Sequence, residues 1–443
     1  MKIQISEHFN YRKLIRFTIP TIVMLIFTSI YGVVDGIFIS NCTGSDSFAA
    51  VNLIMPAIMI LGALGFMIGT GGSALVSKTL GEGKAEKANQ YFSMLIYFLA
   101  IIGITATIIG FFLLPSIAKA LGAKDNILKD CIIYGRTLLI AIVPFMLQNC
   151  FQSFLVVAER PGMGLKISIL AGVTNMLLDF LLVYVLKMGV FGAALATGIS
   201  QFVGASIPLF YFLRKKTKPL HLIKVKFEAR PLLKSCTNGS SEMLTNLSLS
   251  LVNMLYNMQL MKLVGTDGVA AYGIIMYVAF IFSGTYIGYS VGVSPIIGYH
   301  YGAGNKEELK GLLKKSLFLI AITAVIMTVL AEMLSEILAG IFVSYDKDLL
   351  EMTTTAIRLY SLSFMLNGFN IFGSALFTAL NNGAVSALIS FLRTLVFQVA
   401  MILILPVFLE LNGIWLAIVA AEFWALLVTI VCIIANRKNY QYL

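Results

Sequence analysis

Residues 73–88 read SALVSKTLGEGKAEKA, and residues 294–309, 221 positions further along, read SPIIGYHYGAGNKEEL. Each stretch contains a Gly-x-Gly turn, GEG in the first and GAG in the second, and the two turns align at this offset. The same offset holds without a gap on both sides of the turn, so the chain is an internal duplication. The paired identities include Gly44 with Gly265, Asp46 with Asp267, Gly81 with Gly302, Gly83 with Gly304, Asn149 with Asn370 and Ser153 with Ser374.

The composition places both copies in a membrane. Hydrophobic residues make up 59% of the 443 residues and charged residues only 12%, with a mean hydropathy of +0.91. A soluble globular chain has about 45–50% apolar and about 25% charged residues. The apolar runs are continuous and contain interspersed glycine, which is typical of spanning helices, whereas a transmembrane barrel would show short alternating segments. We predict an all-α polytopic membrane protein.

Chain length limits the number of spans. A spanning helix and its connection take about 30–40 residues, so there is room for about eleven to fourteen spans and for no large soluble domain. We predict twelve transmembrane helices, six in each repeat. Because six is even, both repeats enter the membrane from the same side and are parallel. The predicted divisions are an N-terminal lobe at residues 1–213, a basic cytoplasmic linker at 214–235 and a C-terminal lobe at 236–443.

Lysine and arginine mark one set of loops and both ends of the chain. The net charge is +11, and in a polytopic protein such residues usually mark cytoplasmic loops rather than a nucleic-acid interface. We therefore predict cytoplasmic termini in a bacterial-type cytoplasmic membrane, with the linker attracted to anionic lipid. The basic N-terminal sequence MKIQISEHFNYRKLIRF lacks a small-residue cleavage site and reads as a retained signal anchor.

The sequence lacks the groupings that catalysis or metal binding would need. Its five cysteines and three histidines are scattered, without the spacing of a zinc site or a disulfide framework. It contains no nucleophile–histidine–acid grouping and no phosphate-binding G-x-x-x-x-G-K-[ST] loop. We therefore predict that the protein is not an enzyme, has no cofactor and no metal centre, and draws on an ion gradient rather than ATP.

Four carboxylates lie inside predicted spans: Asp35, Asp179, Glu242 and Glu422. An ionised carboxylate at a helix centre costs about 2.5–3.5 kcal/mol on insertion scales, so each must be protonated, paired or in contact with a water-filled cavity. Asn175 precedes Asp179 by four residues, which places both side chains on one helix face. Together with Asp35 they predict a titratable pocket. A neutral, hydrogen-bonded Asp35 and a purely structural polar contact of Asp179 are the alternatives.

Glu242, Glu422 and Arg393 are secondary candidates. Glu242 lies about two turns inside one end of its predicted span, where helix capping or extension toward the membrane surface explains it nearly as well as function. Glu422 is similarly ambiguous. Arg393 can extend to the surface or pair with an acid, and the sequence leaves both alternatives open.

The seventh and eighth predicted spans carry a run of Met, Tyr and Asn. Flexible thioethers and aromatic faces suit bulky, planar and often cationic ligands. In a chain with 20 Met and 31 Phe, the same residues can also be ordinary packing. The candidates for substrate contact are Met254, Tyr256, Asn257, Met258, Tyr277 and Tyr286.

Several motifs resemble those of the multidrug and toxic compound extrusion (MATE) family, in the superfamily that includes lipid and polysaccharide flippases. The resemblance covers nearly the whole chain. It implies two lobes that form a V-shaped cavity, and export of bulky, often cationic drugs or toxic organic compounds by alternating access coupled to inward H⁺ or Na⁺ flow. The matching features are Pro20, Asp35, the GEG and GAG loops, the NMLLD run with Asn175 and Asp179, and GVFGAALAT from Gly189.

The resemblance also implies roles for residues. Asp35, Asn175, Asp179 and Thr197 match the first-lobe positions that bind the coupling cation in one branch of the family. A second branch relies on acids in the seventh and tenth spans. Here the tenth span, LYSLSFMLNGFNIFGSALFTAL, has no carboxylate, and Glu242 lies too early in the seventh. We therefore expect coupling through the first lobe, by protons rather than Na⁺, in a monomer.

Other functions fit parts of the sequence. A lipid-linked precursor flippase would need arginine and lysine in its cavity for pyrophosphate, whereas the spans offer little beyond Arg393. An exporter of an endogenous metabolite would use the same architecture. A major facilitator carrier also has twelve spans, but the loop from Lys78 to Lys87 contains no arginine. A membrane enzyme or scaffold is disfavoured because catalytic groupings are absent.

Overall fold

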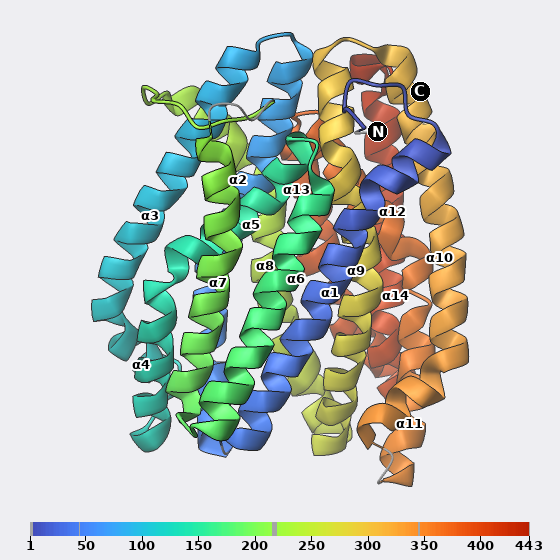
Figure 1. Ribbon diagram of the computed structural model, residues 1–443. Helices are drawn as coiled ribbons and strands as arrows, with labels where there is room; N and C mark the ends of the chain where they lie inside the picture. The colour runs from blue at the N-terminus through green and yellow to red at the C-terminus, as the bar shows by residue number, and fades with distance from the viewer. Residues whose placement is uncertain (1–2, 44, 215–218, 344–345, 443) are drawn as a thin grey trace.

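The computed structural model describes residues 3–43, 45–214, 219–343 and 346–442, and within these ranges the chain forms helices and no strands. The all-α prediction is confirmed. Figure 1 shows the helices running side by side, with both chain ends at one end of the molecule, here called the terminal end; the other is the distal end. The elements are α1 (Tyr11–Cys42), α2 (Ser45–Gly81), α3 (Ala85–Ala120), α4 (Asp125–Ile140), α5 (Ile142–Val157), α6 (Pro161–Leu178), the π-helix η1 (Asp179–Val185), α7 (Gly189–Leu213), α8 (Ala229–Leu263), α9 (Thr266–Gly302), α10 (Lys306–Val343), α11 (Lys347–Ser361), α12 (Phe364–Ala379), α13 (Gly383–Phe391), the π-helix η2 (Leu392–Val396) and α14 (Phe397–Tyr440).

Helix length and apolarity give eight to ten membrane crossings in the described ranges, and two further helical segments can bring the number to twelve. Eight helical segments are long and apolar enough to span a membrane, and two bent pairs, α4 with α5 and α11 with α12, each supply one more. Helix α8 is long enough, with 35 residues, but its Ser, Thr and Asn side chains lower its hydropathy. The segment Gly383–Tyr440 has 58 residues and supplies two crossings, because the φ of 49° at Glu410 interrupts the helix. The described helices are thus compatible with the predicted twelve spans.

The duplication is visible in the helix boundaries. The bounds of α2 and α9 differ by 221 residues at both ends. The bent pairs break at Ala141 and Leu362, also 221 residues apart, with bends of 55° and 47°. Gly83 and Gly304, paired by the same offset, both have the left-handed backbone that ends α2 and α9, with φ of 78° and 69°. The two repeats therefore share one helical frame.

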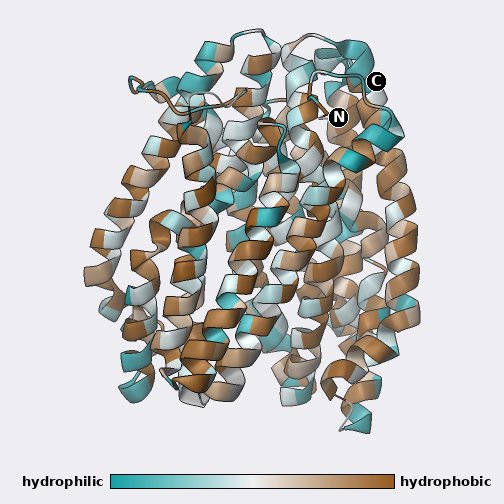
Figure 2. Cartoon of the chain, viewed as in Figure 1, coloured by the Kyte–Doolittle hydropathy of each residue, from teal (hydrophilic) through white to brown (hydrophobic). Residues whose placement is uncertain are grey.

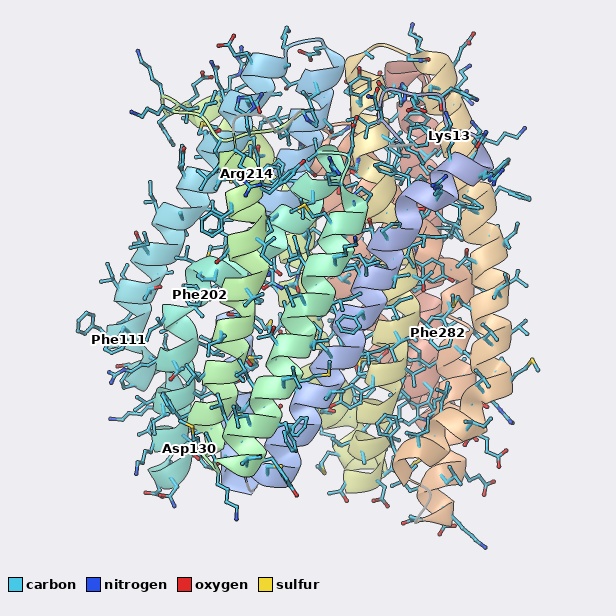
Figure 3. All side chains as sticks on the ribbon, viewed as in Figure 1. Lys13, Phe111, Asp130, Phe202, Arg214 and Phe282 are labelled. Carbon is cyan, nitrogen blue, oxygen red and sulfur yellow. The ribbon has the colours of Figure 1, made fainter. Side chains whose placement is uncertain are left out.

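Apolar side chains cover the outside of the bundle between its two ends. Figure 2 shows hydrophobic residues along the helices and hydrophilic residues concentrated at both ends. Phe112 on α3 and Val407 on α14 are 74% and 76% exposed, which is favourable when the surrounding solvent is hydrocarbon. In Figure 3, Lys13 lies near the terminal end, Asp130 near the distal end and Phe111 between them.

The loops that carry the basic residues gather at the terminal end (Figure 1). Lys78, at the end of α2, lies 5.2 Å from the ring centroid of Tyr301 in α9. Tyr301 in turn packs edge-on against Tyr440 near the C-terminus. Loops of both repeats and the C-terminus therefore lie on one side, as the charge pattern predicts. That this side is cytoplasmic stays a prediction.

The predicted linker runs along α3 before it becomes helical. The backbone N–H of His221 donates to Asn89 Oδ1 at 2.8 Å, and that of Ile223 donates to Ser93 Oγ at 2.9 Å. Helix α8 then begins at Ala229, inside the range predicted as linker. Its first residues are polar or charged as well as apolar, so hydropathy alone places the start of the span too late. Residues 215–218 lie outside the described ranges. The division into lobes and linker stays a prediction.

Two glycines let α2 and α9 touch at the terminal end. Gly81 in α2 lies against the backbone carbonyl of Tyr299 in α9, and Gly302 in α9 lies against the carbonyl of Lys78 in α2. The 221-residue offset exchanges these two contacts, so they form a symmetric pair. A side chain at either glycine would occupy the place of a carbonyl oxygen, and small residues are what allow such close helix contacts in membranes. The first and second repeats are thus in backbone contact at this end.

We expect Gly302→Ala to destabilise the protein by about 1–3 kcal/mol, because the added methyl group overlaps the Lys78 carbonyl and pushes α2 away from α9. Thermal unfolding of the purified protein in detergent should show a lowered midpoint. Gly273→Ala, in the same helix with nothing within 4 Å of the added methyl group, is the matched control and should leave the midpoint unchanged. Equal midpoints for the two variants would contradict the contact.

Candidate functional site

Three residues predicted to act together meet inside the first repeat. Asp35 lies on α1, Asn175 lies in the last turn of α6, and Asp179 follows one turn later, where α6 continues as η1. The side chain of Asp35 lies close enough to those of Asn175 and Asp179 to interact electrostatically with both. Asn175 and Asp179 are buried, at 2% and 0% exposure. The structure thus places two carboxyl groups and one amide side by side; what they bind stays a prediction.

Buried polar atoms of this group lack hydrogen-bond partners within the described ranges. Buried polar groups in proteins are nearly always hydrogen-bonded, and an unpaired one costs about 1–3 kcal/mol. The unpartnered atoms make this group a candidate binding site. Thr197, the fourth predicted residue, lies on α7 of the same repeat, and its hydroxyl also has no partner in the described ranges. The atoms are Asp35 Oδ1, Asp179 Oδ1 and Oδ2, Asn175 Nδ2 and Thr197 Oγ1.

Tyr134 is a member of this group that the sequence did not reveal. It lies on α4, is fully buried, and is close enough to Asp35 and Asp179 to interact electrostatically with both. Its hydroxyl also has no partner in the part of the chain that the structure describes. A single tyrosine in a span carries no signal, and its approach to the acids depends on how α4 and α5 bend. A tyrosine hydroxyl can donate to a carboxylate or accept from a protonated carboxyl group.

The helix geometry changes where Asp179 begins η1. A π-helix adds a residue to the turn, which shifts side chains on one face, and such segments are frequent at functional sites. The amide of Leu186 bonds to the carbonyl of Leu181, five residues back. The equivalent span of the second repeat contains η2, which carries Arg393. In each repeat the altered segment thus carries a charged side chain.

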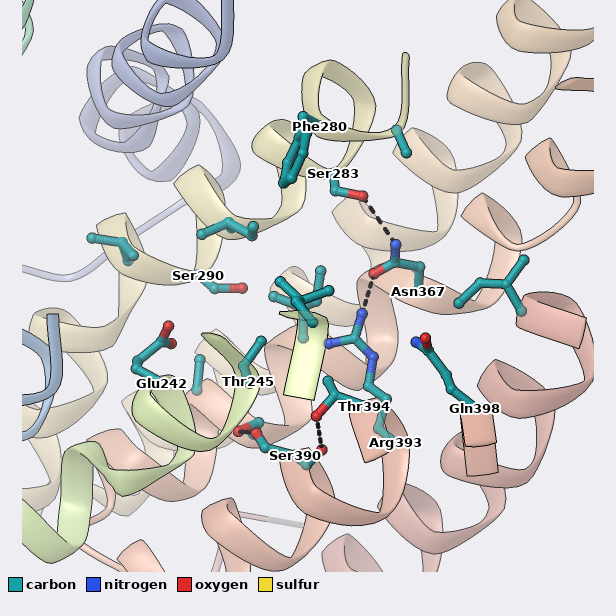
Figure 4. A pocket seen from close by; sticks show the side chains of 18 of the residues that line it. Glu242, Thr245, Phe280, Ser283, Ser290, Asn367, Ser390, Arg393, Thr394 and Gln398 are labelled. Atoms are coloured by element: carbon teal, nitrogen blue, oxygen red, sulfur yellow. Dashed lines mark hydrogen bonds between the residues drawn. The ribbon is translucent and has the colours of Figure 1, made fainter. Parts of the chain in front are cut away.

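Arg393 and Glu422 form a buried ion pair in the second repeat. Arg393 Nε donates to Glu422 Oε1 at 2.9 Å and to Oε2 at 3.0 Å, and Arg393 Nη2 donates to Asn367 Oδ1 at 2.8 Å. Asn370 Nδ2 donates to Glu422 Oε2 at 2.7 Å. Asn367 Nδ2 donates to Ser283 Oγ on α9 at 3.1 Å (Figure 4). Of the alternatives left open for Arg393, the structure has the pairing with an acid.

Glu242 shares a cavity with Arg393 of this ion pair. The cavity, about 180 Å³, lies mainly within the second repeat, and Figure 4 shows Glu242 and Arg393 among the side chains around it. Glu242 therefore faces the protein interior instead of extending to the membrane surface. Thr70 of α2 also lines it, so the cavity reaches the first repeat. The two repeats thus differ in charge: the first has two adjacent acids, and the second has two acids and an arginine.

A larger cavity of about 1260 Å³ lies between the repeats near the distal end, lined by α2, α3 and α8. Its volume exceeds the about 300–1,000 Å³ that is typical of small-molecule pockets. Of the predicted contacts, Met254, Asn257 and Met258 line it, and Met261 joins them. These residues are three or four positions apart and therefore share one face of α8. The helical period thus decides which residues of α8 face the cavity and which face away from it.

The three predicted tyrosines lie elsewhere. Tyr256, on the other face of α8, is 2% exposed and stacks on Tyr272. The hydroxyl of Tyr286 donates to the carbonyl of Phe364 at 2.9 Å inside the second repeat. Tyr277 stacks on the ring of Phe342. Within the described ranges, none of the three lines the cavity between the repeats.

Comparisons with known proteins agree on one family. The family model described as MatE matches residues 20–181 and 243–404, once in each half. Multidrug export protein MepA of Staphylococcus saprophyticus is 25% identical over 408 residues, which cover 91% of this chain and 88% of that protein. MepA of Staphylococcus aureus strain MSSA476 is 24% identical over 419 residues, covering 94% and 92%.

Solved structures show the same fold. An outward-facing multidrug resistance MATE family transporter of the MOP superfamily superposes with a TM-score of 0.92 at 24% identity, covering 98% of each chain. A crystal structure of MATE in complex with MaL6 gives a TM-score of 0.93 at 23% identity, also over 98% of each chain. The predicted fold class, a V-shaped two-lobe transporter fold built from two parallel six-helix repeats, is confirmed.

The cavity between the repeats should be open to water. In a protein whose exposed Cys42 is replaced by Ser, we expect Met258→Cys to react rapidly with a water-soluble maleimide, because Met258 lines the cavity and is 45% exposed. Leu260→Cys, on the same helix but 0% exposed, should react far more slowly. Mass spectrometry of timed samples gives both rates, and equal rates would show that this face of α8 is packed.

Breaking the buried ion pair should be costly. Glu422→Gln leaves Arg393 charged and without its counter-ion, which we expect to destabilise the protein by about 3–5 kcal/mol. Replacing both residues by apolar ones, Arg393→Met with Glu422→Leu, should recover much of this loss, because no buried charge remains. Unfolding midpoints in detergent compare the variants. If the double variant unfolds at or below the midpoint of Glu422→Gln, the uncompensated charge of Arg393 is not the cause of the instability.

Proposed function

The chain belongs to the MatE family, and on that premise we propose that it is a secondary active antiporter for multidrug efflux. It exports bulky, often cationic drugs or toxic organic compounds by alternating access, and inward proton flow drives the export. It works as a monomer in a bacterial-type cytoplasmic membrane, with the terminal end in the cytoplasm. The relatives named MepA are multidrug export proteins, and the chain covers nearly their whole length.

The observation that carries the proposal is the pair of adjacent intramembrane carboxyl groups, the half-buried Asp35 and the buried Asp179. Two carboxyl groups side by side in a low-dielectric setting repel each other when both are ionised. One of them must therefore be protonated, or a bound cation must compensate their charge. Their unpartnered oxygens, with Asn175, Thr197 and Tyr134 in the same repeat, supply the donors and acceptors for such a ligand. Uptake and release of one positive charge at this pair is the step that coupling requires.

A proton suits this site better than Na⁺. A proton needs a single carboxylate oxygen, and sharing one proton between two adjacent carboxyl groups removes their repulsion. A hard metal cation needs several oxygen ligands at once. Coupling by Na⁺ at the same residues is the alternative.

The arrangement of the repeats supports alternating access. At the terminal end α2 and α9 are in backbone contact through Gly81 and Gly302, while the large cavity lies between the repeats near the distal end. A substrate that has entered this cavity can leave on the distal side. Rocking the lobes about their mutual contact would open the terminal end instead.

The energetics are sufficient. One charge that crosses about 150 mV releases about 3.5 kcal/mol, which supports a few-hundredfold gradient of a neutral substrate. Exchange of one monovalent cation for one proton is electrically silent. A second titratable group would restore the voltage drive, and Asp35 with Asp179 provides two groups.

Two other substrate classes are alternatives. A lipid-linked precursor carries a pyrophosphate, which calls for several basic side chains; among the described residues around the large cavity, the charged one is Lys262. An endogenous metabolite would use the same cavity and coupling. Both alternatives predict a transporter without activity toward synthetic dyes.

We expect Asp35→Asn to abolish proton-driven transport of a fluorescent cationic dye. The amide has nearly the same shape but cannot take up and release a proton. Proteoliposomes with an imposed proton gradient or Na⁺ gradient provide the measurement, and the variant should lose at least about tenfold in initial rate, the equivalent of about 1.4 kcal/mol. Glu86→Gln, a change of an exposed acid at the start of α3, is the matched control and should transport normally.

The outcomes separate the alternatives. Sodium-driven transport that is indifferent to Asp35→Asn would move the coupling site elsewhere. Sodium-driven transport that is lost in Asp35→Asn would keep the site and change the ion. No dye transport under either gradient would favour the flippase or the metabolite exporter.

A further inference from the structure

The chain segment before α1 lies across the terminal end of the molecule. Residues 3–10, here called the N-terminal strap, are not helical, yet Ile5 and Phe9 are 2% and 0% exposed. Both side chains belong to one core cluster that contains residues of α9, α10 and α12 from the second repeat and of α1 and α5, including Phe17 and Val156, from the first. The strap is thus buried where the two repeats meet.

Polar contacts fix the strap to α10. Glu308, in the first turn of α10, accepts a hydrogen bond from the backbone N–H of Phe9 at 2.9 Å and contacts His8 Nδ1 at 2.5 Å. Lys315, two turns further along α10, donates to the carbonyl of Phe9 at 2.5 Å. Glu308 is almost fully buried, with its side chain 7% exposed. The second repeat therefore holds both the amide and the carbonyl of Phe9, while the Phe9 ring packs edge-on against Phe17 of α1.

A separate contact fixes the strap to the first repeat. The backbone N–H of Ile5 donates to Glu159 Oε1 at 3.1 Å. Glu159 lies in the turn between α5 and α6 and has a φ of 59°, so its side chain leaves a tight turn toward the strap. The other charged groups of this region, Glu7 and Lys13, pair with each other at 2.7 Å. Two carboxylates from different repeats thus hold two backbone amides four residues apart.

We propose that the N-terminal strap is a latch that holds the two lobes together at the terminal end while the distal end is open. The proposal rests on the proposed function, since it assigns the strap a place in alternating access. The five residues from Ile5 to Phe9 extend to at most about 18 Å, so the strap limits how far Glu159 and Glu308 can separate. Opening the terminal end requires that one anchor breaks.

The two anchors differ in strength, which identifies the one that breaks. The α10 anchor holds two backbone groups of the strap, the amide and the carbonyl of Phe9, through the charged side chains of Glu308 and Lys315. The Glu159 anchor holds one backbone group of the strap, the amide of Ile5. Hydrogen bonds to charged groups stabilise more than those between neutral groups. The strap therefore stays on α10 and releases Glu159 when the lobes part.

Distance measurements test the latch without any transport assay. Spin labels at Glu86→Cys in the first repeat and Lys310→Cys in the second, both exposed positions near the terminal end, report the separation of the lobes in purified protein. We expect Glu159→Gln to raise the long-distance population about tenfold, the effect of weakening one charge-assisted hydrogen bond. Glu307→Gln, beside Glu308 but exposed, is the matched control. An unchanged distribution in Glu159→Gln would overturn the latch.

A cross-link tests the requirement for release. Ile5→Cys with Glu159→Cys, joined by a cleavable bifunctional maleimide, should stop dye transport in proteoliposomes, and cleavage of the linker should restore it. Full transport with the linker intact would overturn the proposal. If the unmodified protein transports no dye, the proposed function fails, while the spin-label distances still decide whether the strap holds the lobes.

Discussion

Two carboxyl groups side by side inside a lipid-embedded helix bundle are the constraint on which this molecule depends. Asp35 and Asp179 lie within reach of each other, and Asp179 is completely buried. Charge of this kind is tolerated in a membrane only when it is neutralised. The second repeat solves the same problem internally, because Arg393 neutralises Glu422 at contact distance. The first repeat has no such arginine among the described residues near its acids, and the proton binding that we propose would balance their charge.

The two repeats differ in their buried charges although their helices have matching boundaries. The 221-residue offset maps α2 onto α9 and the bend at Ala141 onto the bend at Leu362. The same offset maps Asp35 onto Tyr256, and Arg393 onto Gly172. A side chain at Gly172 would collide with Phe27, so the first repeat has no room for an arginine there. The duplication therefore preserved helix geometry while the two lobes took different charges, one suited to exchange and one to stability.

The sequence predicted the fold well because its signals are local or repeated. Apolar composition, the even number of spans and the paired Gly-x-Gly turns led to two parallel six-helix repeats, and the i, i+4 spacing placed Asn175 beside Asp179. The tyrosines show where such reasoning ends. Tyr134 approaches the acids only because α4 and α5 bend, and Tyr256 faces the core because helical spacing turns it away from Met254 and Met258. The partner of Arg393 also depends on packing between three spans.

Proton exchange at the Asp35–Asp179 pair is the central claim, and proton release on substrate binding tests it most directly. Purified protein in detergent and weak buffer would be mixed with a cationic dye while a pH indicator follows the solution. The account predicts that binding releases protons, that the amount falls as the starting pH rises, and that the release disappears in Asp35→Asn. Dye binding without proton release at any pH, or binding that displaces Na⁺ instead, would contradict it.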